Sequence, residues 1–504
     1  MSEEMKNEVV AEEPVAAEKP KSKFNAFLDR KFKLGEKGSN VKTEIIAGLT
    51  TFMAMVYILM VNAGMFADPF GDGTPVLGVS YGAMYIVTAL SAIIGTVLIG
   101  LLSGLPLAQA PGMGLNAFFV YTMCVGFGFS YANALVFILI DGLVFIALTA
   151  TGLREKIFKA IPDDIKKAIP AGIGLFIAFL GLQNAGLVVA DASTGVTMGS
   201  MNFLNDANTW ASLVPLFVTV LGVIAIAAMS KKKVGGAILW GILGSAVLYY
   251  AMLGLGAAFG DESSKAVFAG VSMANPIDAF KDFGTQTIGK VFTDGFNFAP
   301  YIEANGVANF ILMLITSSLA FCLVDMFDTL GTLYGACKSG NLLDENGDVP
   351  NMNKAMMADA IATTTGAILG TSTVTTFVES SAGTAAGGKT ALTSYVVAIL
   401  FAVAMFLSPI AQLIPSCATA TALIYVGVLM MNNVRDIEWS DPAIALPSFL
   451  TIAMMPFTYN ISFGIGFGLL SHVIIKVCTG KAKKVGVATY VLTLIFLLMF
   501  LFTH

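Results

Sequence analysis

Fourteen long apolar runs follow one another along almost the whole chain and leave it few possible folds. Many of them approach the roughly 20 residues that a helix needs to cross a bilayer. The runs are continuous rather than alternating, which argues against a membrane β-barrel. Of the 504 residues 56% are hydrophobic and 12% are charged, whereas a soluble protein has about 25% charged residues. The sequence therefore predicts a polytopic helical membrane protein.

The runs form two series of seven, separated by a polar stretch at 259–305. The first series covers about 44–65, 81–103, 108–128, 131–152, 169–190, 210–229 and 235–258. The second covers about 306–336, 355–375, 377–392, 393–412, 415–432, 443–458 and 460–478. One further run, 485–502, is expected either to span the membrane or to lie at its interface. Residues 1–20 are polar, are expected to be disordered and lack the apolar core of a signal peptide.

Basic residues predict which side of the membrane each connection faces. If the N-terminus is cytoplasmic, only Lys265, Lys281 and Lys290 fall in a connection that faces outward. That connection is the longest one, and the positive-inside rule discounts long loops. We therefore expect a multi-pass protein of the plasma or inner membrane with a cytoplasmic N-terminus.

The five cysteines are scattered without paired spacing, and there are only two histidines. Disulfide frameworks and zinc sites need clustered Cys or His at characteristic spacings. We therefore expect no metal, no cofactor and no nucleic-acid partner.

Two segments within the apolar series contain residues that interrupt helices. In 105–120, Pro111 removes an amide, and Gly112 loosens the backbone further. The segment 374–393 begins with β-branched and aromatic residues, which favour extended backbone. Each segment is predicted to be an extended strip followed by a half-helix whose N-terminus offers free amides. Ordinary Pro/Gly kinks in continuous helices are the alternative.

The two interrupted segments also suggest an internal duplication. Gly95 precedes Pro111–Gly112 by sixteen and seventeen residues, and Gly366 precedes Ala382–Gly383 by the same intervals. With seven spans in each half, the second half must be inserted upside down. Inverted repeats with interrupted helices at the membrane midplane are a common plan among transporters.

Three acidic residues lie at membrane depth. Asp325 and Asp328 are three apart on one helix face, and Glu379 precedes the second half-helix. Insertion scales assign about 2.5–3.5 kcal/mol to an ionised aspartate at a helix centre, so three acids would cost on the order of 10 kcal/mol. They must therefore carry protons or bond suitable donors. A ligand rich in N–H groups would satisfy them; the alternative is that they cap helices or bond neighbouring Ser and Thr.

Three motifs in register carry a family resemblance, namely APGMGLNAFF (110–119), VDMFDTLGTL (324–333) and TFVESSAGTAAGGKTALTS (376–394). They resemble the signature segments of the nucleobase–cation symporters of the nucleobase–ascorbate superfamily, in particular the hypoxanthine–guanine–adenine permease branch. The similarity extends over nearly everything after residue 40. It implies an all-α fold of fourteen helices in two inverted repeats of seven, with spans 1–4 and 8–11 as a core domain and spans 5–7 and 12–14 as a gate domain.

The resemblance also implies domain boundaries. The basic N-terminal segment covers 1–43, the first repeat 44–258 (core 44–152, gate 153–258), the extracytoplasmic loop 259–305, the second repeat 306–480 (core 306–412, gate 413–480) and the C-terminal apolar segment 481–504.

By the same similarity, Glu379 hydrogen-bonds the N–H edge of a purine nucleobase and Asp328 holds the ring from the other side. Asp325 and Asn116 fall at positions that this branch uses for function. The resemblance implies import by proton symport, with Asp325, Asp328 and Glu379 as candidates for proton coupling.

Three smaller features complete the implied site. Ala110 and Gly112 offer backbone contacts, and Phe377 lies against the base or packs as an ordinary core residue. The resemblance further implies movement of the core against the gate and a possible homodimer through the gate domain.

Other functions are compatible with parts of this pattern. An anion exchanger of the same architecture would use the half-helix N-termini, although the three acids would repel an anion. An intramembrane aspartyl protease needs its two aspartates on separate helices and has no reason for inverted repeats. A channel fits an occluded acidic site poorly.

Overall fold

The computed structural model describes residues 23–71, 73–152, 162–202, 205, 208–271 and 275–502. The polar stretch 1–20 lies outside the described residues. Ten helical segments in the described chain are long and apolar enough to cross a membrane. They are α2 with α3 (Val41–Met55, Ile58–Ala67), α4 (Tyr81–Ser103), α6 (Tyr131–Thr151), α8 (Asp163–Asn184), α9 (Trp210–Lys231), α10 (Ala237–Ala258), α15 (Val307–Ser339), α18 with α19 (Ala391–Ala404, Ser408–Ala411), α20 with the 3-10 turn η4 (Ser416–Met430, Met431–Asp436) and α22 (Ile461–Cys478).

The remaining spans of the predicted fourteen are shorter or interrupted. They are α5 with the π-helix η1 (Met113–Ala117, Phe118–Gly126), α16 (Met352–Leu369), α17 (Ser380–Ala385) and α21 (Pro442–Thr458). A further apolar helix, α23 (Val487–Phe502), follows them. The predicted extracytoplasmic connection at 259–305 contains short helices, among them α11 (Glu262–Gly270), α12 (Pro276–Asp282), α13 (Lys290–Thr293) and α14 (Ala299–Asn305).

The third and tenth spans each begin with the extended strip that the sequence predicts. Strand β1 (Gln109–Pro111) pairs antiparallel with β4 (Val374–Thr376), with Ala110 opposite Thr375. Both strands are completely buried. Two further backbone bonds extend the pairing, from Phe377 N to Ala108 O and from Gly112 N to Thr373 O, each 3.0 Å. Because each strip bonds the other, this non-helical backbone is tolerated away from water.

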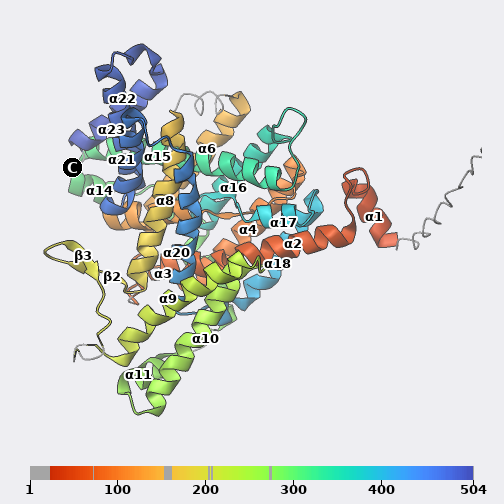
Figure 1. The fold of residues 1–504 in the computed structure, drawn as a ribbon, viewed down its shortest axis with the longest axis vertical. Helices are drawn as coiled ribbons and strands as arrows, with labels where there is room; N and C mark the ends of the chain where they lie inside the picture. The colour runs from red at the N-terminus through yellow and green to blue at the C-terminus, as the bar shows by residue number, and fades with distance from the viewer. Residues whose placement is uncertain are drawn as a thin grey trace, which may run out of the picture.

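The helices pack in two groups (Figure 1). One group contains α2, α4, α6, α16, α17 and α18. The other contains α8, α9, α10, α20 and α21. The long helix α15 contacts α6 and α17 of the first group and α8 of the second. In each group, helices from the first half of the chain lie beside helices from the second half. The residue boundaries of the core and gate domains stay a prediction.

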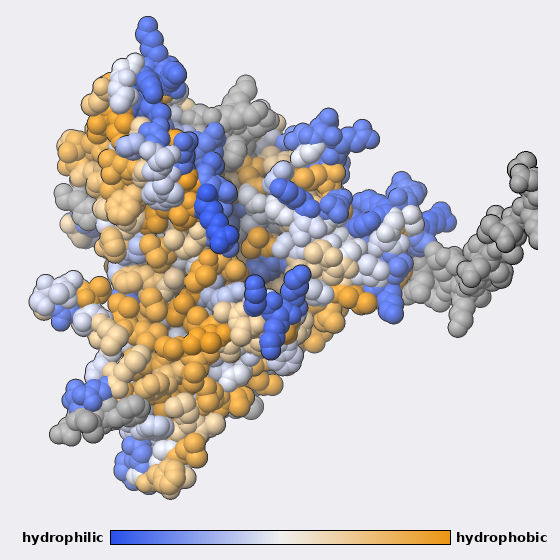
Figure 2. Space-filling view, in the orientation of Figure 1, coloured by the Kyte–Doolittle hydropathy of each residue, from blue (hydrophilic) through white to orange (hydrophobic). Residues whose placement is uncertain are grey.

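Apolar side chains cover the middle of the face seen in Figure 2, and hydrophilic ones gather mainly at its upper and right margins. On α9 and α10 the exposed residues include Leu221, Ile224 and Val247. Large aliphatic side chains that point outward along a helix suit a lipid environment. In addition, α1 (Lys23–Phe32) precedes the first span and projects at the right of Figure 1.

A small antiparallel hairpin, β2 (Val188–Asp191) with β3 (Gly195–Met198), follows α8 and lies at the surface.

Candidate functional site

A cavity of about 720 Å³ lies between the two groups of helices. From the first group and α15 it is lined by Thr50, Ala54, Phe327, Asp328, Gly331, Thr332, Val378, Glu379, Ser381 and Ala382. From the second group it is lined by Pro170, Ser230, 233–238, Tyr425, Val426, Leu429, Met430 and Asn433. Its volume is in the range of about 300–1,000 Å³ that is typical of small-molecule sites.

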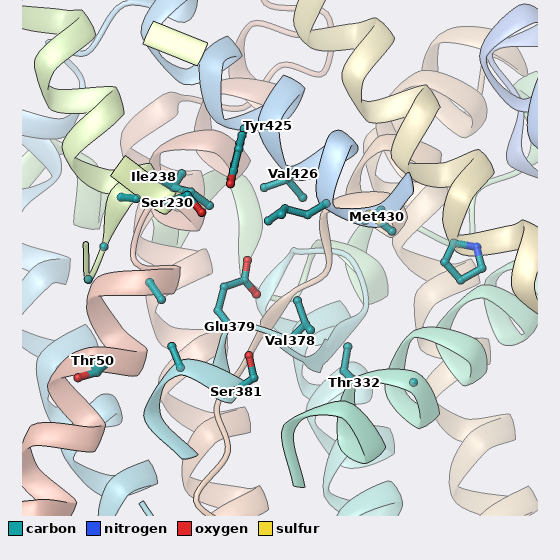
Figure 3. Close-up of a pocket in the computed structure, with 18 of the residues that line it drawn as sticks. Thr50, Ser230, Ile238, Thr332, Val378, Glu379, Ser381, Tyr425, Val426 and Met430 are labelled. Carbon is teal, nitrogen blue, oxygen red and sulfur yellow. The ribbon is translucent and has the colours of Figure 1, made fainter. Parts of the chain in front are cut away.

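Two of the predicted acids line this cavity. Asp328 comes from α15, and Glu379 from the turn between β4 and α17. Both residues are partly exposed, and Val378 beside Glu379 is 51% exposed, although strand β4, which ends two residues earlier, is completely buried. The strip therefore ends at the cavity wall. In Figure 3 Glu379 reaches into this space from below and Tyr425 descends from above.

One oxygen of Glu379 is already bonded. The hydroxyl of Tyr57 donates to Glu379 Oε1 at 2.6 Å. Tyr57 is completely buried and lies in the turn between α2 and α3. The sequence interpretation did not identify this tyrosine, because 322 residues separate the two partners.

The first amides of α17 are not available to a ligand. Ser380 N bonds Phe377 O at 3.1 Å, Ser381 N bonds Val378 O at 2.9 Å, and Ala382 N bonds Glu379 O at 3.0 Å. The prediction that this half-helix presents free amides is therefore wrong for these three residues. A tight turn satisfies them locally, as often happens in the first turn of a helix. The polar group that this turn offers to the cavity is therefore the carboxyl of Glu379, which directly precedes α17, and not these amides.

The third span approaches Asp328 closely. A Cβ atom added at Gly112 would lie 3.6 Å from Asp328 Oδ2 and 2.7 Å from the Thr375 methyl carbon. Gly114 and Leu115 line a second, small cavity of about 20 Å³ that also reaches Asp328. Ala110 is completely buried inside the strand pair and is in the lining of neither cavity.

Asn116 and Phe377 also lie away from the large cavity. Asn116 is completely buried; its side-chain oxygen accepts a bond from Ser372, and its amide donates to Pro111 O at 3.4 Å. Phe377 is 6% exposed and belongs to the apolar core. The structure therefore brings Asp328 and Glu379 together in the large cavity and places Gly112 beside Asp328, outside the lining of both cavities. It does not bring Ala110, Asn116 or Phe377 to the large cavity. The functional roles of all six remain predictions.

Asp325 shares a hydrogen-bond partner, Thr329, with a second buried acid, Asp359. Thr329 Oγ1 donates to Asp359 Oδ2 at 2.7 Å and lies 3.4 Å from Asp325 Oδ1. Gln109 of β1 donates to the other oxygen of Asp359 at 3.2 Å. All four side chains are completely buried. Asp325 thus belongs to a polar network that ties α15, α16 and β1 together.

The sequence interpretation missed three buried acids. Asp359 interrupts an apolar stretch of α16, Asp141 lies within α6 near the hydroxyl of Thr373 at 3.3 Å, and Glu44 is buried near the start of α2. The cost argument applied to Asp325 would have identified Asp359 and Asp141, which lie in the middle of their helices, but not Glu44, which lies in the first turn of α2. In the described part of the chain, no group of three His, Cys, Asp or Glu residues is placed to hold a metal ion.

Comparisons with known proteins agree on the class. The profile of the Permease family matches residues 42–467. The chain is 39% identical over 473 residues to the guanine/hypoxanthine permease PbuG of Bacillus subtilis, covering 94% of this chain and 99% of that one. It is 35% identical over 477 residues to the adenine permease AdeQ of Escherichia coli, covering 95% and 97%.

Among solved structures, the transmembrane domain of a cyanobacterial bicarbonate transporter, BicA, superposes with a TM-score of 0.56 at 15% identity. That match covers 84% of this chain and 97% of that one. At this identity the likeness concerns the fold alone, and it agrees with the predicted arrangement of inverted repeats with core and gate domains.

Proposed function

The chain belongs to the Permease family and is a membrane transporter rather than an enzyme, and from that premise we propose that it imports purine nucleobases by proton symport. The relatives reported above are described as permeases for guanine, hypoxanthine and adenine. The observation that carries the proposal for this chain is the pair of partly exposed carboxyls, Asp328 and Glu379, in one cavity of suitable size.

The chemistry of a purine suits this pair. A purine nucleobase is flat and uncharged and presents N–H donors along its edge. A carboxylate only accepts hydrogen bonds, and bonds from N–H to a charged acceptor are roughly twice as strong as neutral ones. Glu379 accepts hydrogen bonds from the N–H edge of the purine, and Asp328 contacts the ring from α15. The aliphatic side chains of Val378, Val426 and Met430 line the cavity beside them and supply apolar contact for the ring faces.

The same acids couple the transport of the purine to the movement of a proton. A carboxyl that binds a proton changes from acceptor to donor, so protonation of Asp328 or Glu379 changes how the site holds its ligand. Asp325 lies outside the cavity lining and shares Thr329 with Asp359, so in this proposal it is a third candidate for proton coupling, from the buried network. Carboxyl groups titrate readily, which favours protons over sodium ions as the coupled species.

The position of the cavity supports alternating access. It lies between the two packed groups, so movement of one group against the other opens and closes it. We propose a cytoplasmic N-terminus, in the plasma or inner membrane. The connection between α9 and α10 then faces the cytoplasm, and its exposed residues 233–235 line the cavity. Under this proposal the cavity borders the cytoplasmic side of the protein, and a homodimer through the gate helices belongs to the same proposal.

An anion exchanger of the same fold is less compatible with this cavity. An anion would lie beside Asp328 and Glu379, and like charges in a site of reduced dielectric repel strongly.

Uptake into proteoliposomes tests the proposal. Radiolabelled hypoxanthine is offered with and without an inward proton gradient, in competition with guanine, adenine, xanthine or uracil. We expect gradient-driven uptake that purines block and uracil does not. Glu379→Gln should nearly abolish uptake, whereas Glu303→Gln, which removes a charge from an exposed residue of α14, should leave it unchanged. Wild-type uptake by folded Glu379→Gln would remove Glu379 from the site, and absence of purine uptake by the wild type would refute the substrate class.

A further inference from the structure

We propose that Tyr57 is a positioning residue for substrate recognition, which rests on the proposed function. Its hydroxyl holds Glu379 Oε1 and thereby leaves Oε2 as the oxygen that meets the N–H group of the purine. The hydroxyl and Oε1 are 2.6 Å apart, a short distance within the normal range for an O–H donor. Tyr57 itself does not line the cavity, so it acts on the ligand only through Glu379.

The position of Tyr57 is fixed by its place in the first span. Val56 and Tyr57 form a turn that separates α2 from α3, and Tyr57 is completely buried. On the preceding turns of α2, Thr50 and Ala54 line the cavity. Residues four apart lie on one face of a helix, so this face of the first span borders the cavity as far as the turn that holds Tyr57.

The first span runs antiparallel to the second interrupted segment, 374–393, and contacts it at three points. Tyr57 bonds Glu379 at the start of α17. In the middle, Gly383 lies so close to Thr51 and Ala47 that a Cβ atom there would be 2.0 Å from Thr51 Oγ1. Small residues permit this close approach of helices.

At the far end Glu44 completes the contact. Its carboxylate accepts bonds from Lys389 N at 3.0 Å and Thr390 N at 3.3 Å, and from Thr393 Oγ1 at 2.6 Å. Glu44 is completely buried. Because α2 is fixed to the connection after α17 at this end, the distance between the hydroxyl of Tyr57 and Glu379 is set by the packing rather than by the ligand.

The two oxygens of Glu379 therefore have different roles: Oε1 binds Tyr57, and Oε2 is left for the ligand. A carboxylate without an internal partner would rotate about its terminal bond, a torsion with broad preferences. With Oε1 held by Tyr57, the plane of the group is fixed before the ligand enters. Recognition elements that are ordered in advance lose less entropy on binding. Tyr57 should therefore affect affinity more than the maximal rate.

Tyr57→Phe tests this directly, with Tyr85→Phe as the matched control. Tyr85 is also a buried tyrosine of the first group of helices, and its hydroxyl donates to Ala404 O at 3.0 Å, away from Glu379. A hydrogen bond to a charged group makes a larger net contribution than one between neutral groups. We therefore expect the KM for hypoxanthine uptake to rise about tenfold in Tyr57→Phe. The maximal rate should change much less, and Tyr85→Phe should leave the KM near that of the wild type.

A second test measures the effect of Tyr57→Phe in a protein that already carries Glu379→Asp. The shorter side chain withdraws the carboxyl from Tyr57 by one methylene group, so adding Tyr57→Phe should change its KM by less than about twofold, because coupled residues are not additive. Equal tenfold effects in both backgrounds would overturn the proposal, as would a folded Tyr57→Phe protein with the KM of the wild type. Loss of folded protein in Tyr57→Phe but not in Tyr85→Phe would assign the hydroxyl to stability and would also overturn it. If the wild type carries no purine, the proposed function fails instead, so the two failures are distinguishable.

Discussion

Gly383→Ala tests whether the close contact between α2 and α17 determines the site. The added methyl carbon would lie 2.0 Å from Thr51 Oγ1 and 2.6 Å from Ala47 O. The second atom belongs to the backbone, so the clash cannot be relieved by a side-chain rotation alone and the helices must separate. A separation of about 1 Å would lengthen the bond between Tyr57 and Glu379 from 2.6 Å to about 3.6 Å, which is no longer a hydrogen bond.

The energetic cost follows from two opposing contributions. Inserting a methyl group into a packed contact costs about 1–3 kcal/mol. Replacing Gly by Ala within a helix recovers about 1 kcal/mol. The net effect is a destabilisation of up to about 2 kcal/mol, together with weaker binding because Glu379 loses its partner.

Thermal unfolding in detergent and the KM for hypoxanthine measure both effects. Gly335→Ala is the control, since this glycine lies within α15 and a Cβ atom there would meet nothing within 4 Å. We expect a lower melting temperature and a higher KM for Gly383→Ala, and an equal or higher melting temperature with an unchanged KM for Gly335→Ala. If the two variants melt alike and transport alike, the contact does not position the site.

Two further predictions concern coupling and orientation. Asp328→Asn removes a titratable group from the cavity, so purine counterflow should persist while accumulation driven by a proton gradient is lost; gradient dependence equal to that of the wild type would exclude Asp328 from coupling. Cys478 is exposed at the end of α22. If the N-terminus is cytoplasmic, a membrane-impermeant maleimide should label this cysteine in inside-out vesicles only. Cys478→Ser is the control. Labelling in right-side-out vesicles alone would reverse the proposed orientation.

The sequence predicted those parts of the site that depend on local chemistry. Pro111 and the β-branched residues before Glu379 indicated extended strips, and β1 and β4 are found there. The cost of buried charge identified Asp328 and Glu379, which both line the cavity.

What the sequence did not predict depends on contacts between distant segments. The bonds from Tyr57 to Glu379 and from Gln109 to Asp359 join residues 322 and 250 positions apart. No local pattern specifies such partners. The same limit explains Asn116, which the third-span motif marks but which the fold turns toward Ser372 rather than toward the cavity.

The site as a whole is built by contacts between the two halves of the chain. Strand β1 of the first half supplies the backbone partners of β4 in the second. Tyr57 and Glu44, both from the first span, hold the two ends of the segment that carries Glu379. Because the strip of each half satisfies the backbone of the other, neither half can bury its interrupted span alone without unpaired amides and carbonyls at membrane depth. The inverted duplication is therefore a condition for the cavity, since the break that exposes Glu379 is tolerable only when the opposite break lies beside it.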